Sequence, residues 1–251
     1  MLFTPEDIGI LKDEPSKRRR FLNITISQLK PVYLHTLNQY NKVLEQRNNY
    51  LKQIKEEGKK EENLEIWDEQ LASLGIKIYN YRKEYIEKIN KKIKEIHLRT
   101  TENKENIRIE YKSNVNEKEY IEKVKERRKL DIIKGYTTRG IHRDDFEIYI
   151  NDKEISIYGS QGQLRSTIIS LKLAEAEVIY EEIEERPILL LDDFMSELDK
   201  KRIQGFLGNI KENQVIITCT DSFKIPNSEY NLYKVTNASV EMITGKNFKK
   251  T

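Results

Sequence analysis

The sequence predicts an α/β fold in which a sheet is layered with helices and carries an inserted α-helical lobe. Segments with helix and strand patterns alternate between Leu164 and Cys219, which is typical of a sheet covered by helices. Two long amphipathic helix patterns lie between Pro31 and Ile96. We therefore expect three parts: a short remnant of the layered domain at 1–13, a mainly helical lobe at 14–135, and the carboxyl-terminal part of the layered domain at 136–251.

The composition is that of a helix-rich protein with a well-solvated surface and nearly balanced charge. Of the 251 residues 35% are charged, yet the net charge is only +3 and the mean hydropathy is −0.75. A pI near 8.6 is compatible with a nucleic-acid partner without requiring one. The single cysteine, Cys219, excludes an internal disulfide and a cysteine metal cluster. No apolar run of membrane length is present, so we expect a cytoplasmic protein without membrane association.

The amino-terminal segment combines a short strand pattern with a basic helix start. Met1 to Asp7 begins abruptly, as a strand and turn would if what precedes them were missing. Lys17 to Arg20 is a basic run that leads into the apolar Phe21 and Leu22. Two interpretations of the run stay open: a solvated helix face with local ion pairs, and a surface that binds anions.

Two amphipathic helices are predicted for the lobe. From Pro31 to Glu57 apolar positions recur at helical spacing, and a second such pattern runs from Leu71 to Ile96. Gly58 and the charged residues after it separate the two. The pair suits either an antiparallel helical arm or ordinary core helices of a bundle.

The segment after the lobe helices mixes strand and helix patterns. Ile107–Tyr111 alternates like a strand, and Asn116–Ile133 has the spacing of a helix. Between Lys112 and Arg143 there are ten Lys or Arg against five Asp or Glu. Such an excess can meet the phosphates of DNA, although a solvated helix has a similar count. Further on, Asn151-Asp152 lies between two alternating runs, 146–150 and 153–157, and predicts a β-hairpin.

A glycine-containing loop precedes the next helix. The residues Gly159-Ser160-Gln161-Gly162-Gln163 open a helical stripe that continues to Glu185. Free amides and the positive end of a helix dipole favour a phosphate, and glycine lets the backbone approach it. The competing interpretation is that Ser160 only caps the helix.

The most informative stretch is Pro187-Ile188-Leu189-Leu190-Leu191-Asp192-Asp193. A short apolar run after a proline predicts a strand buried on both faces of a parallel sheet. Two carboxylates at its end suit Mg²⁺ and a general base, although an Asp-rich turn or helix cap fits too. A helix to about Ile210, a strand at Gln214–Cys219 and a closing hairpin complete the chain.

Three segments stand in a fixed order: the loop 159–163, the strand ending at Asp192-Asp193, and Ser196-Glu197-Leu198-Asp199. This set resembles the signature loop, Walker B strand and D-loop of an ATP-binding-cassette head of the SMC/Rad50 type. Within that group the chain resembles the RecF family. The pieces that carry this second resemblance are Leu2-Phe3-Thr4-Pro5-Glu6-Asp7, Pro15-x-x-Arg18-Arg19-Arg20-Phe21-Leu22, Tyr40-Asn41-x-x-Leu44-x-Gln46-Arg47-Asn48 and Gly140-x-His142-Arg143-Asp144-Asp145.

The resemblance implies an ATP and Mg²⁺ site shared between two heads. Asp192 would hold Mg²⁺, and Asp193 would stand in the place of the catalytic glutamate. The signature loop would contact the γ-phosphate held by the opposite subunit, through Ser160, Gln161, Gly162 and Gln163. Ser196 and Asp199 would couple the two sites of an ATP-dependent homodimer.

The resemblance also implies partners. Members of the RecF family bind single-stranded and gapped duplex DNA and work with RecR and RecO to help load RecA, with weak ATP hydrolysis. The DNA contacts that we assign in this chain are Arg18, Arg19, Arg127, Arg128 and Lys129.

The chain departs from the family pattern in several places, and these departures leave more than one function open. No GxxxxGK[ST] occurs, so no cradle for the β- and γ-phosphates is expected within the chain. A truncated gene product, a misassigned start and one half of a split protein are all open. Asp13-Glu14, Asn23 and Ile141 replace residues that the family favours. The chain can therefore be an ATPase head, a DNA-binding or dimerisation module without hydrolysis, or another SMC/Rad50-like head.

Overall fold

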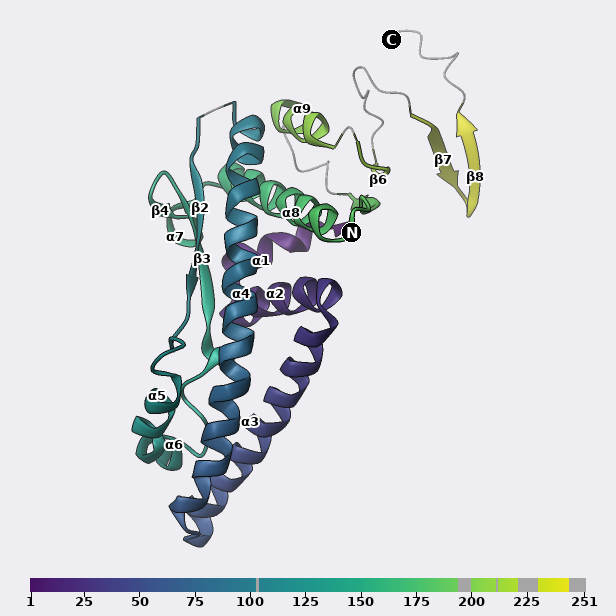
Figure 1. Ribbon diagram of the computed structural model, residues 1–251. Helices are drawn as coiled ribbons and strands as arrows, with labels where there is room; N and C mark the ends of the chain where they lie inside the picture. The colour runs from purple at the N-terminus through teal and green to yellow at the C-terminus, as the bar shows by residue number, and fades with distance from the viewer. Residues whose placement is uncertain (103, 194–199, 211, 221–229, 244–251) are drawn as a thin grey trace.

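The computed structural model describes residues 1–102, 104–193, 200–210, 212–220 and 230–243. Two parts are evident in Figure 1: an elongated lobe built on two long helices, and a layered region around α8. The α/β class expected from the sequence is confirmed.

The lobe is built on α2 (Pro15–Leu29), α3 (Pro31–Glu57) and α4 (Leu64–Thr100). α3 and α4 pack side by side, and the predicted apolar stripe of α3 is buried at Leu37, Tyr40, Val43, Arg47, Leu51 and Ile54. α3 ends at Gly58, whose φ of 68° is the left-handed conformation that glycine adopts without strain. The two predicted lobe helices are therefore confirmed, with α4 starting earlier than its apolar pattern.

An antiparallel sheet covers one side of the lobe. β2 (Ile107–Lys112) pairs with β3 (Asp145–Ile150), and β3 pairs with the short β4 (Lys153–Glu154). Asn151 and Asp152 both have positive φ, 46° and 62°, as a two-residue hairpin turn requires. The expected strand to residue 157 is wrong, because α7 (Ile155–Tyr158) follows β4 directly. This turn buries Ile155, whose carbonyl oxygen accepts from the amide of Gly159 at 3.0 Å.

The expected helix over 116–133 is divided in two. α5 (Tyr120–Glu126) packs on α4 and buries Tyr120 and Val124, whereas α6 (Arg128–Lys134) packs on α3. The two packing surfaces explain the break, because one straight helix cannot present its buried face to both partners.

The second sheet is parallel, in the order β1 (Leu2–Phe3), β5 (Leu189–Asp192), β6 (Val215–Thr218). The parallel pairing of β5 on both sides confirms the sequence prediction. Burial on both faces was expected and is wrong. Leu190 is 39% exposed, and its register partners Leu2 and Ile216 are 50% and 53% exposed. One face of this sheet therefore carries an open apolar row, while Leu189 and Leu191 are buried on the other.

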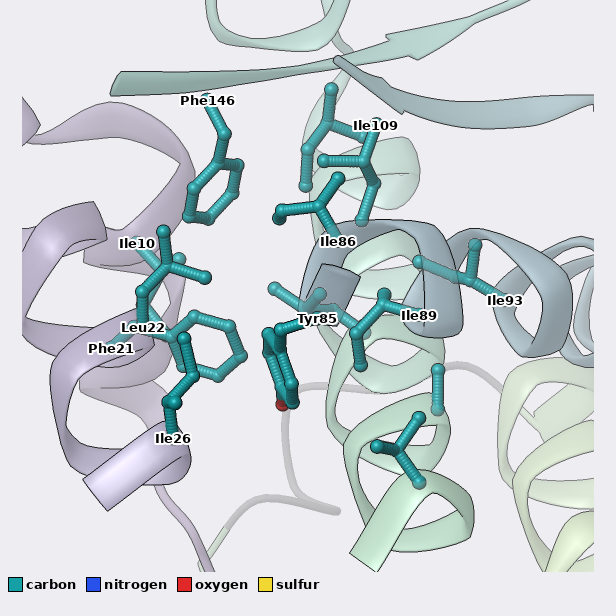
Figure 2. Close-up of a cluster of buried hydrophobic side chains, with 14 of the residues drawn as sticks. Ile10, Phe21, Leu22, Ile26, Tyr85, Ile86, Ile89, Ile93, Ile109 and Phe146 are labelled. Atoms are coloured by element: carbon teal, nitrogen blue, oxygen red, sulfur yellow. The ribbon is translucent and has the colours of Figure 1, made fainter. Parts of the chain in front are cut away.

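The main core lies where α4 meets the amino-terminal helices and α8 (Gln161–Ile183). Figure 2 shows Ile10 of α1 (Gly9–Lys12) and Phe21, Leu22 and Ile26 of α2 facing Tyr85, Ile86, Ile89 and Ile93 of α4, with Ile109 and Phe146 from the sheet above. The remaining elements are the 3₁₀ turns Pro5–Ile8, Glu61–Asn63 and Ile141–Arg143, the helix α9 (Lys200–Asn209), and the hairpin of β7 (Leu232–Thr236) with β8 (Ser239–Ile243). In the described parts of the chain, every helix is too short or too polar to cross a membrane.

Candidate nucleotide site and its supports

Two exposed carboxylates mark the carboxyl end of the central parallel strand. Thr218, at the end of β6, donates its hydroxyl to Asp192 Oδ1 at 2.7 Å and accepts the amide of Asp193 at 3.0 Å. Both aspartates are exposed. Most aspartates are exposed in proteins, so exposure alone assigns no role. It does mean that a ligand in solvent can reach this end of the sheet.

Asp192 offers an oxygen ligand of the kind that magnesium binds in proteins. In the described residues no cluster of three His, Cys, Asp or Glu side chains could hold a metal. Mg²⁺ does not need such a cluster, since it commonly takes one or two carboxylates, several waters and substrate phosphates. The hydroxyl of Thr218 orients one carboxylate oxygen of Asp192, which leaves the other for the cation.

Asp193 is held by its backbone in an unusual conformation. Its φ is 47°, in the left-handed region that non-glycine residues seldom occupy. The hydrogen bond from its amide to Thr218 supports that turn. The chain therefore leaves the strand sharply at this residue, so that a second carboxylate follows the first at the end of the sheet.

The loop before α8 forms a capping box. Ser160 Oγ accepts the amide of Gln163 at 3.2 Å, and Gln163 Oε1 accepts the amide of Ser160 at 3.0 Å. The capping role of Ser160 is thus confirmed. The capping box leaves two other amides of the first turn, those of Gln161 and Gly162, without an intrahelical acceptor. An anion at this terminus would meet both amides and the positive end of the dipole.

A chain of polar contacts, not anticipated from the sequence, ties this loop to the end of α4. Gln163 Nε2 donates to Glu105 Oε1 at 3.0 Å, and Glu105 Oε2 lies 3.3 Å from His97 Nε2. His97 Nδ1 in turn contacts Ser170 Oγ at 2.9 Å. Burial lowers the pKa of His97, and the Glu105 carboxylate opposes that shift. Glu105 lies in a polar segment without periodicity, so no sequence signal pointed to it.

The two D-loop residues, Ser196 and Asp199, lie outside the described residues. Their predicted role in coupling two sites stays a prediction.

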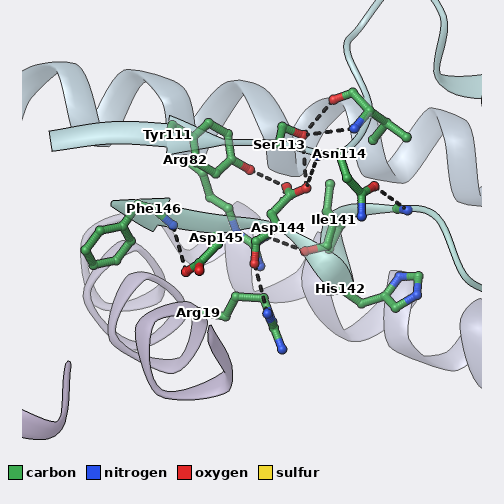
Figure 3. Close-up of polar contacts among 12 residues, drawn as sticks. Arg19, Arg82, Tyr111, Ser113, Asn114, Ile141, His142, Asp144, Asp145 and Phe146 are labelled. Atoms are coloured by element: carbon green, nitrogen blue, oxygen red, sulfur yellow. Dashed lines mark hydrogen bonds and ion pairs between the residues drawn. The ribbon is translucent and has the colours of Figure 1, made fainter. Parts of the chain in front are cut away.

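Two of the arginines assigned to DNA join the lobe to the sheet. Arg18 makes a two-pronged ion pair with Asp145, with distances of 2.6 and 2.9 Å. Arg19 Nη1 donates to the carbonyl oxygen of Asp144 at 2.9 Å, and Figure 3 shows it beneath that residue. These contacts are neither local nor on a solvated face, since they join α2 to residues 127 and 125 positions away at partly buried sites. They fix α2 against the start of β3. DNA contact by Arg18 and Arg19 stays a prediction.

Asp144 is the hub of this junction (Figure 3). Its buried carboxylate accepts from the Tyr111 hydroxyl at 2.5 Å, the Ser113 hydroxyl at 2.9 Å and the Asn114 amide at 3.1 Å. Arg82 Nη1 lies 3.5 Å from Asp144 Oδ2 and donates to the carbonyl oxygen of Ile141 at 2.7 Å. Despite these donors, burial raises the pKa of Asp144. The segment from Gly140 to Asp145 therefore serves the junction between the lobe and the sheet.

His142, in the same segment, is half-buried and neutral. Its Nε2 lies 3.1 Å from the carbonyl oxygen of Thr137, which can only accept, so the proton sits on Nε2. Nδ1 then accepts from the Tyr40 hydroxyl at 2.8 Å. Burial lowers the pKa of His142 to about 4, and nearby arginines act in the same direction.

The other assigned DNA residues lie on and before α6. Arg128 pairs with Asp68 at 2.5 Å and with Glu65 at 2.9 Å, so it is engaged within the chain. Arg127 is half-buried and Lys129 is exposed. DNA contact by all three stays a prediction.

Beside them, Arg47 is fully buried among acceptors from two helices and the loop after α6. It pairs with Asp68 at 2.7 Å and with Asp131 at 2.8 Å, and it donates to the Thr137 hydroxyl at 2.8 Å. Asp131 also accepts the amide and hydroxyl of Thr138. This buried group links α3, α4 and α6. From the sequence, only the aliphatic part of the Arg47 side chain was expected to be buried, as part of the apolar stripe of α3.

Comparison with known proteins places the chain in a family. It is 43% identical over 245 residues to the DNA replication and repair protein RecF of Acetivibrio thermocellus. The aligned residues cover 93% of this chain and 66% of that protein. The RecF protein of Lachnoclostridium phytofermentans is 41% identical over 244 residues, covering 96% of this chain and 68% of that protein. The chain belongs to the RecF family. It spans about two thirds of the length of these curated relatives. No family model matches the chain.

Solved RecF structures have the same fold. A structure of the recombination mediator protein RecF with ATP, in the RecFOR pathway, superposes with a TM-score of 0.84 at 37% identity, covering 96% of this chain and 66% of that one. A second, described as RecF-ATPrS, gives a TM-score of 0.83 at 38% identity, covering 96% and 67%. The RecF fold is therefore present over nearly all of the chain.

Proposed function

We propose that this chain acts in DNA repair and recombination as a mediator whose DNA binding depends on ATP. The observation that carries the proposal is the pair of exposed carboxylates at the end of the central parallel strand, Asp192 and Asp193, in a chain of the RecF family. The solved relatives are described with ATP or RecF-ATPrS, which supports ATP as the ligand.

In this proposal the two carboxylates have different roles, one as metal ligand and one as general base. Asp192, oriented by Thr218, would hold Mg²⁺. Bound there, the ion would neutralise charge on the phosphates. Asp193 orients the attacking water and takes its proton.

The phosphates themselves are held by other segments. The 251 residues contain no GxxxxGK[ST], so we place the phosphate cradle outside them. Gln161 and Gly162 offer their amides, with Ser160 and Gln163, to the γ-phosphate bound by an opposite head. Closure of two heads then completes each site, while Ser196 and Asp199 couple them. ATP in this arrangement holds the dimer closed, and slow hydrolysis reopens it.

The partners follow from the family. We propose single-stranded and gapped duplex DNA as the ligand, and RecR and RecO as the proteins with which the dimer acts to help load RecA. The solved relatives are described as part of the RecFOR pathway, which supports this assignment at the level of the pathway.

A second candidate is a module that binds DNA or dimerises without hydrolysis. The missing GxxxxGK[ST] favours it for the chain by itself. Measuring ATP affinity and turnover of the 251 residues separates the two. We expect no measurable turnover without an added phosphate cradle, and tight ATP binding by these residues alone would contradict the division of the site.

The catalytic assignment is tested in a chain extended with the segment of a RecF-family relative that carries GxxxxGK[ST]. Asp193→Asn should keep ATP-dependent dimerisation, measured by light scattering, and lower turnover about 100-fold or more, because general-base catalysis contributes at least that much. Asp192→Asn serves as the matched variant and should weaken dimerisation as well, since it removes the Mg²⁺ ligand. Undiminished turnover in Asp193→Asn would remove this residue from the base role.

A further inference from the structure

A basic hollow lies on the lobe, between α3 and the turn that follows α6. Its volume is about 370 Å³. It is lined on one side by Asn48, Lys52, Lys55 and Glu56 of α3, and on the other by Lys134 at the end of α6 and by Tyr136. We call it the lysine pocket. In Figure 1 α6 and the lower half of α3 lie at the far end of the lobe from α8 and β6, so the lysine pocket is separate from the candidate nucleotide site.

The charge of the lysine pocket is not balanced within the chain. Its lysines, Lys52, Lys55 and Lys134, are exposed, and over the described residues none of them lies within 4 Å of a carboxylate. Some lysines of the lobe are paired, such as Lys112 with Glu110 at 2.9 Å, and others, such as Lys77 and Lys91 on α4, are exposed like those of the pocket. The pocket differs because it gathers three such lysines around one hollow. Three unpaired cations against the single carboxylate of Glu56 give this surface a local excess of two positive charges. An anion is therefore the ligand that it favours.

The wall of the pocket is fixed before any ligand arrives. Gly135 ends α6 with a φ of 74°, and its amide donates to the carbonyl oxygen of Asp131 at 2.7 Å. On the other side of Tyr136, the amide and hydroxyl of Thr137 both donate to Asn48 Oδ1, at 2.8 and 2.7 Å. Tyr136 thus stands between two anchored residues, which lowers the entropic cost of using it in binding.

Tyr136 offers an aromatic surface beside the lysines. Its side chain is 39% exposed, and the guanidinium of Arg143 lies 5.4 Å from the ring centroid. Lysines next to an exposed aromatic ring are the combination with which proteins bind single-stranded nucleic acid, since the cations meet phosphates and a base stacks on the ring.

We propose that the lysine pocket binds a single DNA strand, with phosphates at Lys52, Lys55 and Lys134 and an unpaired base against Tyr136. This inference rests on the proposed function for its choice of DNA as the polyanion. An acidic protein segment would use the lysines but would gain nothing from a stacked base, so the two ligands differ in what Tyr136 contributes.

The first test removes the charges. Lys52→Gln/Lys55→Gln/Lys134→Gln is compared with Lys77→Gln/Lys91→Gln/Lys94→Gln, a matched set of exposed lysines on α4, by fluorescence anisotropy of a labelled thymidine oligonucleotide over a salt series. Because each phosphate contact to a single strand contributes about 0.7 to the slope of log K against log salt, the pocket variant should lose about 2 from that slope. Its affinity at low salt should fall about tenfold or more, while the α4 variant keeps both values near those of the parent chain.

The second test asks whether a base meets the ring. Tyr136→Ala should weaken binding of the thymidine oligonucleotide about fivefold or more. An abasic strand of equal length and a duplex, whose bases are already paired, should bind the parent and Tyr136→Ala chains equally. An equal loss on the abasic strand would mean that Tyr136 supports the pocket and meets no base, and would overturn that part of the proposal.

The outcomes separate the pocket from the function. If the parent chain binds DNA and the pocket variant binds it as tightly, the lysine pocket is not the site and the proposed function stands. If the parent chain binds no DNA at any salt, the pocket proposal fails. The same assay with ATP, on a chain extended with the GxxxxGK[ST] segment of a RecF-family relative, then decides the proposed function, which fails if that longer chain binds no DNA either. In a third outcome, polyglutamate displaces the labelled oligonucleotide as well as unlabelled thymidine oligonucleotide does, and Tyr136→Ala changes the affinity for neither polymer. The pocket would then bind an acidic protein, and the DNA proposal would be overturned.

Discussion

The lobe and the end of the parallel sheet use acidic residues in opposite ways. Asp68 and Asp131 within the lobe, and Asp144 at its junction with the antiparallel sheet, are fully buried, and each accepts several hydrogen bonds from arginine, hydroxyl or amide groups. At the sheet Asp192 and Asp193 are exposed and share Thr218. A carboxylate surrounded by donors holds elements together, whereas one that faces water can be reached by a ligand. Burial therefore distinguishes these structural acids from the two acids of the candidate site.

The largest effect should follow from removing the cation of the buried group. Arg47→Leu leaves Asp68 and Asp131 with fewer partners in a place without water, so we expect a loss of about 3–5 kcal/mol in the free energy of unfolding. Urea denaturation followed by circular dichroism measures it. Arg20→Leu, at an exposed arginine, is the matched control and should stay within about 0.5 kcal/mol. An equal effect in both variants would break the contrast between buried and exposed charge.

A smaller effect should appear on acidification. The pKa of His142 falls from 6.5 to about 4 on folding because burial disfavours the cation. The unfolded chain then binds the proton more readily, so stability is present above pH 6.5 and is lost as the pH falls towards 4. The loss should reach up to about 3 kcal/mol at 1.36 kcal/mol per pKa unit.

The comparison that isolates His142 is its replacement by a residue that does not titrate. His142→Asn should reduce the dependence of the unfolding free energy on pH between 6.5 and 4, whatever it does to stability at pH 7. The buried His97, whose pKa is also lowered, keeps part of the dependence in that variant. An unchanged pH profile would mean that His142 titrates normally.

The smallest effect should come from the sheet. Asp192→Ala removes one hydrogen bond to Thr218 at an exposed position, so we expect the free energy of unfolding to change by less than about 1 kcal/mol. Thermal unfolding without nucleotide measures it. A loss as large as that of Arg47→Leu would show that Asp192 supports the fold, which would remove the distinction drawn above.

The parts of the fold that follow from sequence periodicity were predictable. The apolar spacing of α3 and α4 and the Asn151-Asp152 turn depend on local residues, and the structure has them where the pattern predicted. The parallel strand β5 was recognisable because a short apolar run ended in acids. The order of loop, strand and acids also identified the candidate site before any contact was known.

The parts that depend on contacts between distant residues were not predictable. The division of 116–133 comes from two packing surfaces on different helices, α4 and α3. The link from Gln163 through Glu105 to His97 joins residues separated by 58 and 8 positions, with no periodic signal. The open row at Leu190 was missed because an apolar run indicates that a strand prefers burial, while only the neighbours decide whether both faces are covered.

The left-handed backbone of Asp193 decides how its chemistry can be studied. At a φ of 47° asparagine is tolerated nearly as well as aspartate, whereas alanine and other residues with a Cβ and no local hydrogen-bonding group are strained by about 1 kcal/mol or more. Asparagine therefore removes the carboxylate and keeps the turn, so in the proposed ATPase a loss of turnover would report on the carboxylate itself. Alanine would change the path of the chain at the same time, and a loss of turnover would then have two explanations.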